Sequence, residues 1–115
     1  MITEAVLEIV IEWFQKTKVA GLELPRGWFG RPLGNLHQLT WPAAREHKLL
    51  WELDRQLLLV LTEPAEAKTT PAELVIAGCA QVTLDWQEYG SFKPHVEDHG
   101  AGPVRFVSPA ALVRG

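Results

Sequence analysis

Apolar side chains recur every three or four residues at the start of the chain, which predicts an amphipathic helix over residues 3–18. Thr3 suits the N-cap, and Lys16 and Lys18 suit the negative end of the helix dipole. Leu7 and Ile11 fall outside the main stripe, so we expect the helix to be covered on more than one side. The stripe itself consists of Ile2, Val6, Ile9, Val10, Trp13 and Phe14.

A segment rich in glycine and proline, residues 22–35, follows and is typical of a long ordered loop. Beyond it the apolar positions alternate with period two, which predicts an antiparallel sheet over residues 36–107. The clearest hairpin joins residues 49–53 to 57–61 through Asp54 and Arg55, and the near-continuous apolar run in its second half indicates a central strand.

Over the rest of the chain, the pattern of apolar and polar residues predicts further strands separated by polar connections. Residues 64–71 and 94–102 have the composition of loops, Gly78 marks a turn or bulge, and a frayed tail begins at residue 108. The pattern therefore predicts a single α+β domain, with the N-terminal helix packed on a curved antiparallel sheet or partial barrel of five to six strands. The expected core includes Leu57, Leu59, Leu61, Leu84, Trp86 and Phe106.

Composition narrows the classes of function. The 115 residues carry a formal net charge of −3, which argues against nucleic acid or an anionic membrane as the partner. The single cysteine, Cys79, excludes an intrachain disulfide, and we expect it to be a buried apolar thiol. With no secretory signal or membrane span visible in the sequence, we expect a cytoplasmic protein without a cofactor.

The segment PRGWFGRP, residues 25–32, is the first candidate site. It places Trp28 and Phe29 between glycines and flanks them with Arg26 and Arg31. Tryptophan and arginine are enriched at interface hot spots, and arginine can hold a carboxylate or phosphate through two hydrogen bonds. The alternative is structural: the two aromatic side chains could turn inward and plug the end of the sheet.

The segment HVEDH, residues 95–99, is the second candidate. If it is extended, His95, Glu97 and His99 point to one side, and two imidazoles with a carboxylate suit a divalent metal ion such as zinc. The alternative is a polar loop that contains two histidines.

A third candidate, DWQEYG at residues 85–90, offers Asp85 and Glu88 as an acid and base pair with Tyr89 as a further donor. On a regular strand, however, the two carboxylates would project to opposite faces. We therefore assign no catalytic residue.

The stretches LPRGWFGRPLGN, LDRQLLLVL and DWQEYG together resemble a group of small uncharacterised bacterial proteins that share a GWFGRP … DWxEYG pattern. The resemblance covers most of the chain from Leu24 to Val107. It implies a bacterial, cytoplasmic origin and no particular activity, substrate or cofactor.

These observations favour a small binding domain, of an accessory or immunity type, that occupies the surface of another protein through the Trp28 segment. One alternative is a metal-assisted hydrolase built on His95, Glu97 and His99. The other is a homodimer or larger structural assembly formed through the apolar N-terminal helix.

Overall fold

A computed structural model of the protein describes residues 4–39, 47–86 and 95–109. The predicted helix is confirmed as α1 (Glu4–Lys16), and the expected N-cap, Thr3, lies outside the described residues. Within these described ranges ten strands follow, namely β1 (Gly21–Leu24), β2 (Gly27–Trp28), β3 (Leu36–Leu39), β4 (Lys48–Leu53), β5 (Leu57–Thr62), β6 (Glu66–Thr69), β7 (Glu73–Cys79), β8 (Gln81–Trp86), β9 (His95–Asp98) and β10 (Gly102–Val107).

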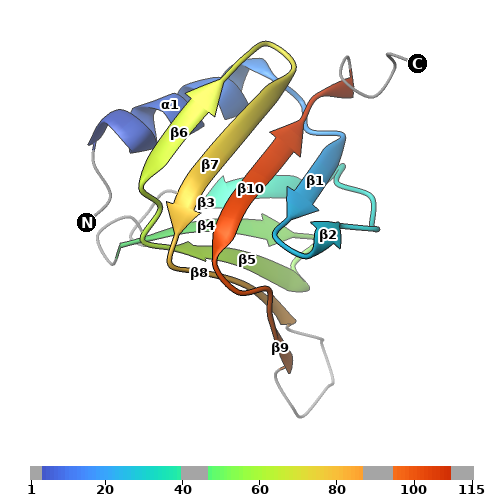
Figure 1. Ribbon diagram of the computed structural model, residues 1–115. Helices are drawn as coiled ribbons and strands as arrows, with labels where there is room; N and C mark the ends of the chain where they lie inside the picture. The colour runs from blue at the N-terminus through green and yellow to red at the C-terminus, as the bar shows by residue number, and fades with distance from the viewer. Residues whose placement is uncertain (1–3, 40–46, 87–94, 110–115) are drawn as a thin grey trace.

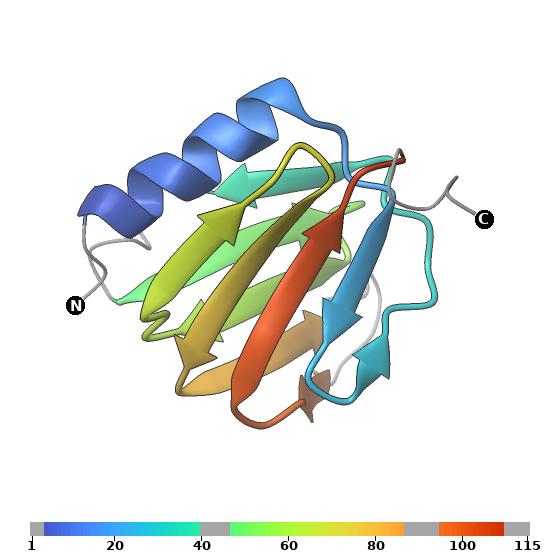
Figure 2. The same cartoon turned by 45° about the horizontal axis from the view of Figure 1, so that its top comes forward.

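The strands form two five-stranded sheets that face each other (Figure 1). Sheet A has the order β2-β1-β10-β7-β6, sheet B has the order β3-β4-β5-β8-β9, and every pairing is antiparallel. Figure 2 shows α1 lying along the β6 edge of sheet A and above β3 of sheet B. The predicted α+β class with a helix on antiparallel sheet is confirmed, but the five to six strands expected in one sheet are, among the described residues, ten strands in two sheets.

The prediction of an uninterrupted loop over residues 22–35 is wrong. Residues 21–28 form a hairpin in which β1 and β2 are joined by a turn at Pro25 and Arg26. Leu22 and Leu24 are buried on one side of β1 and Glu23 faces the other side, which is the alternation of a strand. The proline that suggested a loop occupies only the turn.

The two polar connections also contain strands. Residues 66–69 form β6 and residues 95–98 form β9, and each is the outermost strand of its sheet. Edge strands often carry charged side chains, so their composition resembles that of loops. The start of the predicted frayed tail is ordered, because Ser108 is buried and its N–H donates to the carbonyl of Ala72 at 2.8 Å, while residues 110–115 lie outside the described residues.

The predicted β4–β5 hairpin is confirmed, and its second strand is the central one of sheet B. Asp54 and Arg55 adopt φ values of 52° and 58°, as the two central residues of a type I′ turn require. A hydrogen bond of 2.7 Å from Asn35 Nδ2 to Asp54 Oδ1 supports this turn in the absence of glycine.

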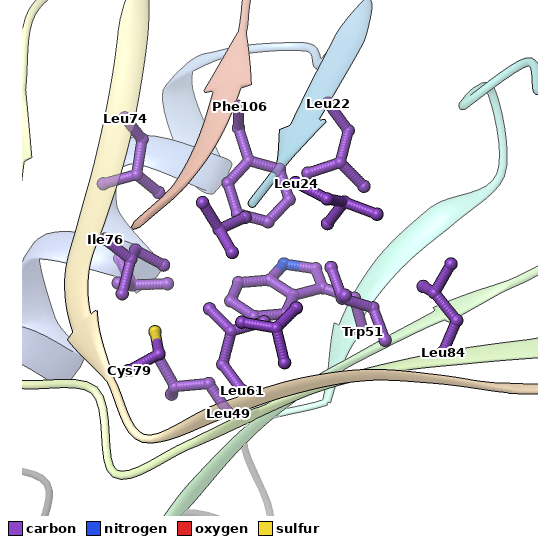
Figure 3. Packing of buried hydrophobic residues seen from close by; sticks show 14 of the residues in the cluster. Leu22, Leu24, Leu49, Trp51, Leu61, Leu74, Ile76, Cys79, Leu84 and Phe106 are labelled. Carbon is purple, nitrogen blue, oxygen red and sulfur yellow. The ribbon is translucent and has the colours of Figure 1, made fainter. Parts of the chain in front are cut away.

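The hydrophobic core lies between the two sheets and α1. Figure 3 shows Leu22 and Phe106 of sheet A facing Trp51 of sheet B, and the ring centroids of Trp51 and Phe106 are 4.8 Å apart. Phe14 of α1 packs against both rings. Its ring centroid lies 5.6 Å from that of Trp51 and 5.0 Å from that of Phe106, so the helix closes the opening between the sheets. The predicted core residues are buried except Trp86, which is partly exposed.

Leu7 bears on the prediction of a dimer formed through the helix. It lies outside the main apolar stripe, yet it packs against the core of the same chain. The apolar surface that suggested a partner for the helix is therefore covered in part by the two sheets.

Three connections carry the chain from one sheet into the other on the same side of the molecule, and we call this region the corner (residues 63–65, 78–81 and 99–102). There β5 leads into β6, β7 into β8, and β9 into β10 (Figure 1). Each connection contains a residue with positive φ: Glu63 at 51°, Gly78 at 73°, and Gly100 and Gly102 at 76° and 138°. Hydrogen bonds continue through the bend, from Ala65 N–H to Ala77 O at 3.0 Å and from Ala80 N–H to Thr62 O at 2.9 Å.

Two independent features of the corner require glycine at position 78. Its φ of 73° disfavours any residue with a side chain, and a Cβ atom added there would lie 2.5 Å from Cβ of Ala65. We expect Gly78→Ala to lower the free energy of unfolding by about 2–4 kcal/mol, through backbone strain and overpacking together, as measured by urea denaturation.

Gly34→Ala is the matched control for this substitution. Gly34 has no atom within 4 Å of an added Cβ and no positive φ, so we expect a change below about 0.5 kcal/mol. Equal losses in the two variants would contradict the assignment of Gly78 to a tightly packed bend.

Candidate functional site

The two adjacent aromatic residues of the PRGWFGRP segment have different environments. Trp28 lies on β2, at the edge of sheet A, and 53% of its surface is exposed. Phe29 packs against the hydrophobic core, and its N–H donates to the carbonyl of Leu22 at 2.8 Å. The inward plug considered for both side chains therefore applies to Phe29 and not to Trp28.

Trp28 belongs to a row of side chains that crosses the outer face of sheet A. In the register of the sheet, Glu23 lies opposite both Trp28 and Arg105. The guanidinium carbon of Arg105 lies 5.1 Å from the centre of the Trp28 ring, within range of a cation–π interaction. Sequence alone did not indicate Arg105, because this contact depends on the register of β1 with β10.

Two carboxylates hold Arg105 in place beneath Trp28. Arg105 Nη1 donates to Glu73 Oε2 at 2.9 Å and Nε donates to Glu23 Oε1 at 3.1 Å. The hydrogen bond to Glu73, with the charges of both carboxylates, raises the pKa of the Arg105 guanidinium above its ordinary value. The Trp28 ring is thus supported by a side chain that is itself fixed on both sides.

The two arginines of the segment also separate. Arg26 is exposed in the β1–β2 turn. Arg31 lies in the connection between β2 and β3, and its guanidinium carbon is 4.8 Å from the centre of the Trp86 ring at the end of β8. This segment therefore contacts sheet B through Arg31 and belongs to sheet A through Trp28.

The HVEDH segment is extended, as its metal-site interpretation required. His95–Asp98 pairs with β8, placing His95 opposite Trp86 and Glu97 opposite Leu84. Glu97 lies between the two histidines, with Oε1 at 4.0 Å from His95 Nε2 and Oε2 at 3.9 Å from His99 Nε2. These separations suit ion pairs with protonated imidazoles, and within the described ranges no set of three His, Cys, Asp or Glu side chains has the arrangement to hold a metal ion.

The remaining candidates contribute little to a site. Asp85 is on β8, while Glu88 and Tyr89 lie outside the described residues. Cys79 is buried, as expected, and burial raises the pKa of its thiol to about 11. A thiol with that pKa stays protonated at neutral pH and is a poor nucleophile.

Comparison with known proteins adds no relative, since no family model, curated protein or solved structure matches this chain. Among the described residues, no helix has the length and apolar character to cross a membrane.

The different environments of Trp28 and Phe29 predict different effects on stability. We expect Trp28→Ala to lower the free energy of unfolding by about 1 kcal/mol or less, because it removes a half-exposed ring and one exposed cation–π contact. Phe29→Ala should lower it by more than about 2 kcal/mol, since it removes a ring that packs against the core. Thermal unfolding of the two variants measures both values, and a loss of about 3–5 kcal/mol for Trp28→Ala would place that ring in the core instead.

Proposed function

We propose that the protein is a small cytoplasmic binding domain that recognises another protein through the surface formed by Arg26, Trp28 and the neighbouring Arg105. The observation that carries the proposal is the half-exposed Trp28 ring, held on the outer face of sheet A by a fixed arginine. Tryptophan supplies a large contact area from a side chain with only two rotatable bonds, and it is enriched among residues that dominate binding energies.

The support beneath Trp28 favours recognition over a purely structural role. Arg105 is fixed by Glu23 and Glu73, so little freedom is lost when a partner covers the ring. Arg26 adds an exposed positive charge in the adjoining turn. A rigid aromatic side chain beside an exposed cation suits a partner surface that combines an apolar pocket with acidic groups, as an accessory or immunity-type protein requires.

Site-specific photocrosslinking tests this proposal. A photoreactive phenylalanine analogue replaces Trp28 in one variant and Val96 in the other, because Val96 is also an exposed large apolar residue, at 56%, and lies on β9 of sheet B. Irradiation in cells of the source organism should give a discrete adduct with one protein from position 28 and none from position 96.

The proposal is supported only if position 28 crosslinks and position 96 does not. Equal labelling from the two positions, or no discrete adduct from position 28, would reject Trp28 as the recognition residue. The melting temperatures of both variants are measured first, so that a failure to fold is recognised.

A further inference from the structure

Two arginine–tryptophan stacks in this structure differ in what their guanidinium groups can still bind. Arg105, stacked on Trp28, donates to Glu23 and Glu73. Arg31, above Trp86, is exposed, and among the residues that the structure describes it donates no hydrogen bond and joins no ion pair. Within the described part of the chain, the first guanidinium is therefore occupied and the N–H groups of the second have no acceptor.

The Trp86 ring restricts how Arg31 can present those N–H groups. A guanidinium 4.8 Å from the centre of an indole is held against its face by the cation–π interaction. Its donors form a planar fork that matches the two oxygens of a carboxylate or phosphate. A stacked arginine has also lost part of its rotamer freedom before it binds, which reduces the entropy lost on binding.

The charges near Trp86 favour a carboxylate over a phosphate. His95 lies opposite Trp86 across the β8–β9 pair, and Glu97 follows two residues along on the same side of β9, with 42% of its side chain exposed. The negative charge of Glu97 opposes a dianionic phosphate more strongly than a carboxylate of single charge. The net charge of −3 adds to this preference.

We propose that Arg31, held by Trp86, binds a carboxylate of the partner protein. The proposal rests on the proposed function, and it adds a second contact that reaches sheet B beyond the Trp28 surface. It also names the chemistry of the recognised group: an aspartate or glutamate side chain, or a chain terminus.

Nuclear magnetic resonance of the arginine Nε–H signals tests the proposal in the whole protein. The probes are an acetylated and amidated triglutamate peptide, a neutral triglutamine peptide with a free C-terminus, and inorganic phosphate, all at constant ionic strength. We expect a concentration-dependent shift at Arg31 with one or both carboxylate peptides, larger than at Arg26, which is exposed without a ring beneath it, and larger than at Arg105, which is occupied. The peptide that produces the larger shift distinguishes a side-chain carboxylate from a terminal one.

Two variants separate the stacked geometry from charge alone. Trp86→Phe weakens the stack and should reduce the Arg31 shift to the value at Arg26. Arg31→Lys keeps the charge but loses the planar fork, and the peptide-induced shift of the Trp86 indole signal should disappear. Unchanged Trp28 and Arg105 signals verify that each variant is folded.

A shift at Arg31 no larger than at Arg26, or a larger shift with phosphate than with either peptide, would overturn the proposal. A shift that persists unchanged in Trp86→Phe would do the same. If position 28 crosslinks to a partner but the carboxylate peptides shift the Arg31 signal no more than the Arg26 signal, the proposed function stands and the carboxylate contact is rejected. Absence of any adduct from position 28 rejects the proposed function whatever the titration shows.

Discussion

At the corner, three connections carry the chain from one sheet into the other, and the packing there leaves no space for a side chain at residue 78. Gly78 faces Ala65 across the bend, and hydrogen bonds from Ala65 and Ala80 keep the neighbouring chains paired through it. The bend turns the inner face of sheet A toward that of sheet B, which brings Phe106 against Trp51. Helix α1 then covers the opening that remains, with Phe14 in contact with both rings.

The same bend places the candidate functional residues. One continuous segment forms β9 at the edge of sheet B and then β10 inside sheet A, so it supplies His95 beside Trp86 and Arg105 beside Trp28. The segment around Trp28 and Arg31 takes part in both contacts, since Arg105 lies against its Trp28 and its Arg31 lies against Trp86. The two cation–π pairs therefore link distant parts of the sequence, the first within sheet A and the second between the β2–β3 connection and sheet B.

Several features of the fold are predictable because they depend on local pattern. The near-continuous apolar run over residues 57–61 identifies a central strand, and the three- and four-residue spacing up to Phe14 identifies the helix. Polar edge strands are not predictable in this way, since β6 and β9 bury little and resemble loops in composition. Strand β2 has only two residues, too few for an alternation to be recognised.

The candidate site is predictable only in part. The unusual composition of residues 25–32 marks Trp28 and Arg31, and the spacing of His95, Glu97 and His99 correctly places them on one side of an extended segment. The partners of these residues come from other strands: Arg105 meets Trp28 only through the pairing of β1 with both β2 and β10, and Trp86 of β8 meets Arg31 of the β2–β3 connection. Such contacts depend on register, which no single segment of sequence determines.

The central claim is that the corner joins the two sheets into one cooperative unit, and amide hydrogen exchange tests it most directly. The amides of Ala65 and Ala80 donate hydrogen bonds within the bend, so they should exchange as slowly as the hydrogen-bonded amides of β5, through global unfolding. Exchange at Ala65 and Ala80 as fast as in the exposed turn at Asp54, while β5 remains protected, would show that the sheets open separately and would contradict the account.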